Sequence, residues 1–347
     1  MVGVRKEEYL TYQGLLAALP ERGRVHLLLG NGFSIACDPI FRYASLYDAA
    51  VEAGLSARAQ EVFARHGTNN FEGVLRLLED TEWVARRYGV APEALNGIRE
   101  DIDVVRNTLV EAVTRAHLDH PGLIADQRKA AARNFIARYH NVFTTNYDLL
   151  LYWIVLHEGN PSHQDGFRAD EEDPEAEYLV FSERLGDRKA IFYVHGAIHL
   201  FLQGGELRKH SWIRSQRRLT DLIREGLQRG QYPLFVAEGR PEQKLEQIQR
   251  VGYLWYALDK LSRIQGPLVV FGHSLGQSDN HITNALARNT DLRELFVGLH
   301  GDPDNQQNQL IRAAAERIGQ LRQGLAGARG GSLTIRYYDS GTAAPWG

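Results

Sequence analysis

The feature that most constrains the fold of this chain is a set of short apolar runs, most of which end at a glycine, an asparagine or another turn residue. The runs are four or five residues long, and most are continuous rather than alternating. Such runs are typical of parallel strands that helices cover on both faces. They lie at residues 25–29, 142–145, 191–194, 233–237, 268–271, 295–299 and 333–337.

Segments with helical spacing separate these runs. Residues 241–264 carry apolar side chains at steps of three and four, and residues 279–287 and 305–325 also have helical patterns. Alternating strands and helices predict an α/β fold with a doubly wound, Rossmann-like parallel sheet. Ligands of such sheets bind outside the carboxyl ends of the strands, so the residues that follow each run are the candidates for a functional site.

One connection in this pattern is unusually long. More than a hundred residues separate the first apolar run from the second, and they contain four segments with helical spacing at 46–51, 71–88, 92–117 and 127–139. We therefore predict a single domain over residues 1–347 with a helical insertion at 45–140. The insertion is expected to lie over the strand ends and to help form the ligand pocket. The tail after Tyr338 is small and polar, and we expect it to be frayed.

Composition narrows the classes of function. Lys and Arg number 40 against 43 Asp and Glu, a net charge of −3, so direct nucleic-acid binding by the whole surface is not expected. The single cysteine, Cys37, excludes an internal disulfide and a four-cysteine zinc site. The most apolar run has eight residues, whereas a membrane helix needs about 20. With no apolar signal segment at the start, we expect a cytoplasmic protein with no membrane contact.

Two segments are strongly charged with opposite sign. Residues 165–177 hold seven acidic side chains, and residues 207–230 hold seven basic ones. Such runs are usually solvated faces of loops and helices, and the alternative is a contact between subunits of complementary charge.

The first candidate site motif is Gly30-Asn31-Gly32-Phe33-Ser34, directly after the first apolar run. Glycines allow a turn to pass close to a ligand, and free backbone N–H groups at a helix start attract phosphate. The motif lacks the third glycine of the Rossmann fingerprint. A plain turn from strand to helix explains it equally well.

Polar residues follow three further runs. Thr145, Asn146 and Asp148 follow the second run, where capping of the next helix is the structural alternative. His195 follows the third run, and its ordinary pKa near ~6.5 makes it usable as a base at neutral pH, although a lone histidine is more often structural. After the run at 268–271 come Gly272 and Ser274, and then Ser278 and Asp279, which are suited to cap a helix.

In this order, Gly-x-Gly-x-Ser, Thr-x-Asn-x-Asp, His-Gly and Gly-x-Ser-Leu resemble the sirtuin NAD-binding fold. The chain is most similar to an uncharacterised bacterial group among the sirtuin-like proteins, several of which are NAD hydrolases of antiphage defence. The likeness covers residues 30 to about 282. It includes a Val-x-Glu-Gly-(x)₄-Lys segment, here Val236, Glu238, Gly239 and Lys244.

The resemblance implies roles for individual residues. Asn146 would lie beside the nicotinamide ribose, Asp148 would hold the carboxamide, and His195 would be the catalytic histidine. The implied cofactor-binding set is Gly30, Asn31, Gly32, Phe33, Ser34, Thr145, Gly272 and Ser274. Two positions depart from the sirtuin pattern, because Asn31 stands for the usual alanine and Thr145 for the usual glutamine.

Sirtuin deacylases carry a four-cysteine zinc module, which this chain cannot form. The resemblance therefore implies a metal-free NAD glycohydrolase that uses water as the acceptor and releases nicotinamide and ADP-ribose. Two alternatives remain: a module that binds NAD or ADP-ribose without turnover, and another NAD-consuming transferase, either a deacylase or an ADP-ribosyltransferase. The relatives further imply a latent antiphage effector that forms a homo-oligomer, in some cases with an ATPase- or helicase-like partner.

Overall fold

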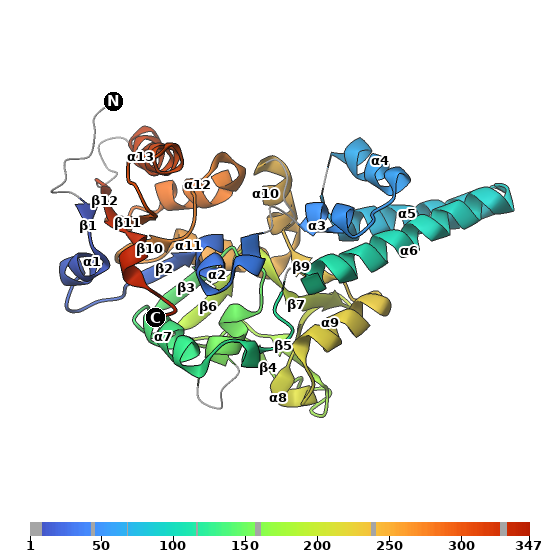
Figure 1. The fold of residues 1–347 in the computed structure, drawn as a ribbon, viewed down its shortest axis with the longest axis horizontal. Helices are drawn as coiled ribbons and strands as arrows, with labels where there is room; N and C mark the ends of the chain where they lie inside the picture. Colours follow the sequence, from blue (N-terminus) through green and yellow to red (C-terminus); the bar gives the residue numbers. More distant parts are fainter. Residues whose placement is uncertain are drawn as a thin grey trace.

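The computed structural model of the chain describes residues 9–42, 46–67, 69–115, 117–156, 161–236, 241–326 and 332–347. It confirms the α/β class, with a parallel sheet between layers of helices (Figure 1). Within the described residues, no helix combines the length and the apolar character that crossing a membrane requires.

The central sheet has seven strands in the order β1-β12-β11-β10-β2-β3-β6, and each of its pairings is parallel. Six of the predicted runs form strands of this sheet. The strands in spatial order are Tyr9–Leu10, Thr334–Asp339, Glu294–Leu299, Leu268–Phe271, His26–Leu29, Asn141–Thr144 and Ala190–Tyr193.

Helices cover both faces of this sheet (Figure 1). On one side lie α11 (Gly252–Ser262), α12 (Asn280–Arg288) and α13 (Gln306–Ala326), and on the other lie α1 (Tyr12–Ala18) and α7 (Asp126–Ala137). Strands β2 and β10 are buried along their whole length. This double cover is the reason that their sequences are continuously apolar.

A second, antiparallel sheet was not predicted. Its five strands follow the order β4-β5-β8-β7-β9, so the prediction that residues 233–237 belong to the parallel sheet is wrong. β9 pairs with β7 through Gly196–Phe235 and Ala197–Leu234 instead. The strands in this order are Phe167–Arg168, Tyr178–Phe181, Glu206–His210, Gly196–Gln203 and Pro233–Phe235.

The two charged segments meet within one chain on this second sheet. β5 and β8 pair antiparallel, and the ammonium of Lys209 lies 2.5 Å from a carboxylate oxygen of Asp165. The guanidinium of Arg214 donates to the backbone oxygen of Ala176 at 3.1 Å. Part of this opposite charge is therefore paired within one chain.

The predicted insertion forms α3 (Leu46–Glu52), α4 (Ala57–His66), α5 (Phe71–Arg87), α6 (Pro92–Arg115) and α7. α5 and α6 pair along their length and project from the body as an arm (Figure 1). At the start of α5, Asn70 caps the helix and Phe71 is fully buried, with its ring 5.0 Å from that of Phe63.

Two further expectations are corrected. Residues 241–264 form two helices, α10 (Pro241–Arg250) and α11, rather than one. The tail is ordered: after β12 a 3₁₀ turn, Ser340–Ala343, leads to Trp346, which is 2% exposed and donates its indole N–H to the backbone oxygen of Phe33 at 2.9 Å. A buried tryptophan with a satisfied N–H holds the end of the chain against the fold.

Candidate functional site

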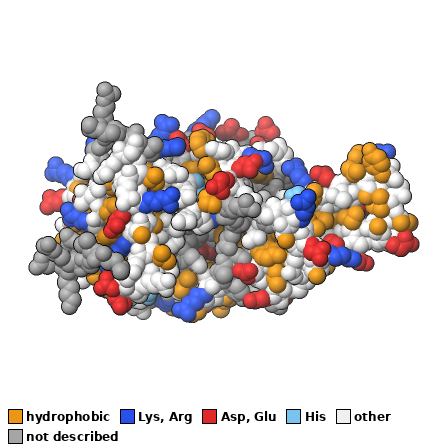
Figure 2. All heavy atoms as spheres, turned by 90° about the horizontal axis from the view of Figure 1, so that it is seen from above, with side chains coloured by type: hydrophobic (Ala, Val, Ile, Leu, Met, Phe, Trp, Pro, Cys, Tyr) orange, Lys and Arg blue, Asp and Glu red, His pale blue; other side chains and the backbone are white. Residues whose placement is uncertain are grey.

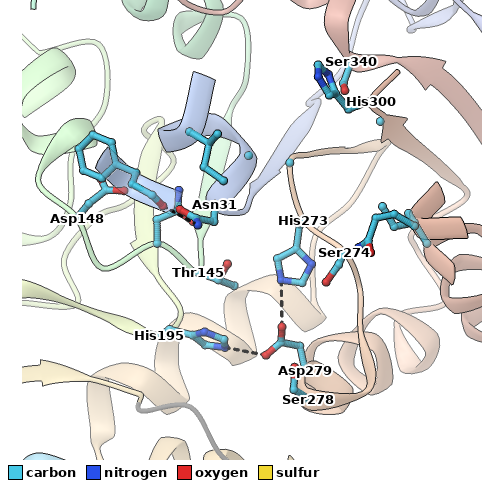
Figure 3. Close-up of a pocket in the computed structure, with 18 of the residues that line it drawn as sticks. Asn31, Thr145, Asp148, His195, His273, Ser274, Ser278, Asp279, His300 and Ser340 are labelled. Atoms are coloured by element: carbon cyan, nitrogen blue, oxygen red, sulfur yellow. Dashed lines mark hydrogen bonds and ion pairs between the residues drawn. The ribbon is translucent and has the colours of Figure 1, made fainter. Parts of the chain in front are cut away.

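A cavity of about 890 Å³ opens at the carboxyl ends of the parallel strands (Figure 3). Residues after β2, β3, β6, β10 and β11 line it, which is where ligands of doubly wound sheets bind. Eight of the eleven predicted site residues are in its lining: Asn31, Gly32, Thr145, Asn146, Asp148, His195, Gly272 and Ser274.

The insertion contributes less to this cavity than predicted. Of the described residues between 46 and 140, only His117, which follows α6, is in the lining. The arm therefore points away from the strand ends rather than covering them (Figure 1). Phe71 lies in the core of the insertion, and the side chain of Glu72 lies outside the described residues.

The turn after β2 contains two glycines because its backbone lies very close to the backbone of the turn after β10. The backbone N–H of Gly30 donates to Phe271, and that of Gly32 donates to Gly272, at 3.0 and 2.9 Å. A Cβ on Gly30 would lie 2.5 Å from the oxygen of Gly272, and one on Gly32 would lie 2.6 Å from its Cα. Only glycine fits at these two positions. The turns after β2 and β10 are thus locked together beneath the cavity.

Three of the predicted polar residues bind one another. The side-chain amide of Asn146 donates to Ser34 Oγ at 2.8 Å and to the backbone oxygen of Gly30 at 3.0 Å. The Ser34 hydroxyl in turn donates to the carboxylate of Asp148, which also accepts the backbone N–H of Leu150 at 2.9 Å. Ser34 is fully buried, so it acts from beneath the cavity wall, and Asn146 is left with its carbonyl oxygen for a ligand.

Burial raises the pKa of Asp148 from its ordinary value of 3.8 to about 6, and the hydrogen bonds from Ser34 and Leu150 only partly offset this effect. Because the folded-state pKa lies above the unfolded one, Asp148 contributes stability at low pH that is lost as the pH rises from about 4 to about 6. The full effect is about 3 kcal/mol.

We expect Asp148→Asn, which carries no charge at any pH, to remove this dependence. Relative to wild type, the free energy of unfolding of the variant should rise by about 1–1.5 kcal/mol between pH 5 and pH 7.5. Urea denaturation at the two pH values measures the difference. Asp126→Asn is the matched control, because the Asp126 side chain is 96% exposed. If the free energies of unfolding of Asp148→Asn and wild type differed by the same amount at both pH values, the raised pKa of Asp148 would be contradicted.

His195 is buried and belongs to a larger network than the sequence indicated. Its Nε2 lies 2.7 Å from Nε2 of His281 on α12 and 3.8 Å from a carboxylate oxygen of Asp279. Burial lowers the pKa of His195 well below 6.5, so the imidazole is neutral at pH 7. Since two facing nitrogens 2.7 Å apart share one hydrogen, one of the two rings donates and the other accepts.

Asp279 joins this histidine pair to two further side chains, and Figure 3 shows it between His195 and His273. Lys244 on α10 places its ammonium 2.9 Å from Oδ1, and Nε2 of His273 lies 3.5 Å from Oδ2. Nδ1 of His273 accepts the backbone N–H of Leu275, so its Nε2 carries the proton that faces Asp279. Burial alone raises the pKa of Asp279, but the electrostatic influence of His273, His195 and the Lys244 ammonium outweighs it and holds that pKa below its usual range.

Ligand atoms of His195, Asp279 and His281 lie within 4.8 Å of one another, a spacing that suits a metal ion. However, the Lys244 ammonium already binds Asp279, and a divalent cation would have to share that carboxylate with it. We therefore interpret the cluster as a network of hydrogen bonds and charges around a neutral imidazole.

The structure corrects the predicted placement of Phe33. The side chain is 1% exposed, its ring centroid lies 5.0 Å from that of Trp346, and it packs in the core rather than in the cavity wall. Asn31 lines the cavity, but its side-chain amide donates to the backbone oxygen of Phe41 at 3.0 Å. Gly30 and Ser34 support the wall from behind.

Several residues of the site were not predicted as such. Asp279 was interpreted as a helix cap, Lys244 had no role, and His273 and His281 were not singled out. A signal was present, since His273 and His281 flank Asp279 directly after a buried strand. Glu238 and Gly239 of the same segment as Lys244 lie outside the described residues.

A family model described as "Domain of unknown function (DUF4917)" matches residues 27–346. The match includes every described residue that lines the cavity. A comparison with curated proteins found no match.

Proposed function

We propose that this chain, which belongs to the DUF4917 family, is an NAD glycohydrolase that releases nicotinamide and ADP-ribose. The observation that carries the proposal is the meeting of Asn146, Asp148 and His195 in one cavity beside the Gly32–Gly272 crossing. Asn146 and Asp148 follow β3, His195 follows β6, and the two glycines follow β2 and β10. The sirtuin-like resemblance assigns the three polar residues to cleavage of NAD and the two glycines to its binding.

The cavity is large enough for a dinucleotide. Its volume of about 890 Å³ is at the upper end of the range for small-molecule sites. It runs from His195, after β6, to His300 and Ser340, after β11 and β12. We assign the nicotinamide riboside to the end with Asn146 and His195, and the adenosine to the end with His300.

The chemistry requires a base that is uncharged at neutral pH. Breaking the glycosidic bond sends its electron pair to the pyridinium nitrogen and builds positive charge on the ribose, and water then bonds to the same carbon. Neutral His195 takes the proton from that water, a step worth about 10²- to 10⁴-fold in rate. Asp279, 3.8 Å away, stabilises the imidazolium that forms, and His281 offers a path for the proton.

The direct test is incubation of the purified protein with NAD and quantification of nicotinamide and ADP-ribose. Asn146→Ala should lose cleavage, and it should cost about 1 kcal/mol of stability because the side chain binds two neighbours. Products from wild type but not from the folded variant support the proposal. No nicotinamide from either protein, in any oligomeric state, would contradict it.

The binding-module alternative has one observation in its favour. Ser34, Asn146 and Asp148 already satisfy much of one another's hydrogen bonding, as in a rigid binding wall. Retained NAD affinity without nicotinamide release in wild type would favour this alternative. Transfer of label from NAD to protein would instead favour a transferase.

We further propose that the hydrolase is latent and acts in antiphage defence as a homo-oligomer. Support for assembly now comes from the end of the arm, where Figure 2 shows hydrophobic side chains gathered. Trp83 and Tyr88 are 61% and 84% exposed, and Val84 and Val90 beside them are 45% and 39% exposed. Such patches on a folded protein mark interaction sites.

We expect the double variant Trp83→Ser, Tyr88→Ser to lower the mass measured by light scattering at micromolar concentration, because it removes the exposed aromatic area. Leu310→Ser, at a residue that is 61% exposed on α13, is the matched control and should keep the wild-type mass. A monomeric wild type, with or without NAD, would refute assembly through the arm.

A further inference from the structure

A second cavity of about 520 Å³ lies at the opposite edge of the parallel sheet. One of its lining residues, Gln164, bridges Ala190 at the amino end of β6, whereas His195 follows the carboxyl end of the same strand. The described linings of the two cavities have no residue in common. The second cavity is therefore a separate site.

Positive charge dominates the lining of this cavity. Arg168, Arg184 and Arg188 are exposed at its rim, and Lys209 lies in its floor with 4% of its side chain exposed. Asp165 is the one carboxylate among the described lining residues, and the ammonium of Lys209 at 2.5 Å neutralises it. The three guanidinium groups remain, and arginine is the residue that best matches phosphate oxygens.

The arginines at the rim form few ion pairs with carboxylates among the described residues. Glu171 lies 3.9 Å from Arg184, and both side chains are more than three quarters exposed, so solvent screens this pair. Arg168 donates to the backbone oxygen of Arg184 rather than to a carboxylate. An incoming anion would thus displace water and at most one weak ion pair.

The walls between these charges are aromatic and apolar. Tyr152 and Phe167 place their rings 5.5 and 5.0 Å from the Lys209 ammonium, and Leu179 and Ile213 complete the apolar surface. A cavity with a cationic rim and an aromatic wall suits a ligand that joins phosphates to a flat ring.

We propose that this second cavity binds a nucleoside diphosphate or triphosphate, with the phosphates on Arg168, Arg184 and Arg188 and the base against Phe167, which is partly exposed, whereas Tyr152 behind it is 1% exposed. Among the described lining residues no histidine is free to act as a base, because both nitrogens of His163 have partners and burial lowers its pKa to about 4. The site is built for binding rather than for chemistry.

One short segment joins this site to the first cavity. Tyr152 begins the π-helix Tyr152–Leu156, four residues after Asp148 of the first site. Its hydroxyl accepts the backbone N–H of Trp212 at 3.0 Å, and its ring lies 5.3 Å from that of His199 on β7. Through this segment we expect a bound nucleotide to change the activity of the first site, a role that rests on the proposed function.

Titration calorimetry with ADP tests the binding claim. Arg184→Ala with Arg188→Ala should weaken one ADP-binding event by at least tenfold. The matched control is Arg250→Ala with Arg263→Ala, at the end of α10 and directly after α11, where the side chains are 75% and 76% exposed. This control should bind ADP as wild type does. The proposal would be overturned if both double variants lost ADP affinity equally, or if neither lost it. Pyrophosphate that binds as tightly as ADP would overturn the role of the aromatic wall.

Photocrosslinking with 8-azido-ADP separates the two cavities. Labelled peptides should contain Phe167, and labelling confined to residues of the first cavity would overturn the proposal. A separate assay compares NAD cleavage with and without ADP, in wild type and in the Arg184→Ala, Arg188→Ala variant. If the chain never cleaves NAD, the proposed function fails while calorimetry and crosslinking still decide the nucleotide site.

Discussion

Replacing His195 with alanine is expected to lower nicotinamide release from NAD by about 10²- to 10⁴-fold, the usual worth of a general base. The reason is that His195 is the neutral imidazole at the cavity wall and has Asp279 at 3.8 Å to stabilise its protonated form. The measurement is product formation per folded molecule at saturating NAD. Binding of NAD should survive, because Gly272, Ser274 and the distal half of the cavity are untouched.

His195→Gln separates the loss of the base from the loss of packing better than His195→Ala does. The amide keeps a hydrogen bond to His281 and much of the ring's volume, so the fold should be preserved, but it cannot take a proton. Both variants should melt within a few degrees of wild type while cleavage falls. Unchanged turnover in either folded variant would end the claim that His195 is catalytic. A lowered melting temperature with unchanged activity per folded molecule would indicate a structural role.

The second large effect is on stability. We expect Gly32→Ala to lower the free energy of unfolding by roughly 3 kcal/mol or more, because its Cβ would lie 2.6 Å from the Cα of Gly272 and backbone cannot move aside cheaply. The φ angle of Gly32 is not in the left-handed region, so the clash alone is responsible. Urea denaturation followed by circular dichroism measures the loss.

Gly324→Ala is the control for this variant. Gly324 is exposed within α13, and a Cβ there meets nothing within 4 Å. That substitution should stabilise the protein by about 0.5–1 kcal/mol, since alanine is the better helix former. Equal stability of wild type and Gly32→Ala would mean that the two turns are not packed as described.

The sequence was most informative where one physical cause dominates. Strands β2, β3, β6 and β10 are covered on both faces, so nearly all of their side chains are buried and apolar. Each of these continuous apolar runs predicted a strand. The polar residues after them had to meet at one edge because parallel strands end together. Eight of the predicted site residues line the cavity for this reason.

The second sheet escaped prediction because Gly196 divides one apolar stretch between two sheets. β6 ends at Tyr193, and Gly196 begins β7, whose first six residues are all buried, without the alternation that marks a half-exposed strand. Gly196 has φ +75°, and a Cβ there would lie 2.1 Å from the backbone oxygen of Leu234. That contact is between residues far apart in sequence, so no local pattern reveals it.

The network around His195 was missed for a related reason. Lys244 and His281 sit on α10 and α12, and their positions depend on how these helices pack against the end of β6. From sequence alone, a lysine or histidine inside a helix is predicted to face solvent, because the packing of the helix is not known. Phe33 shows the reverse error, since the motif placed it beside a ligand while Trp346 holds it in the core.

The contact between Trp346 and Phe33 joins residues 313 positions apart, across nearly the whole chain. β2, which carries the glycine turn, also needs β10 as its neighbour, and β1 pairs with β12. During synthesis, therefore, the strand that emerges early must wait for partners made near the end. The cavity cannot close on a ribosome-bound chain that lacks them. For the NAD glycohydrolase that we propose, this delay would keep unfinished chains inactive.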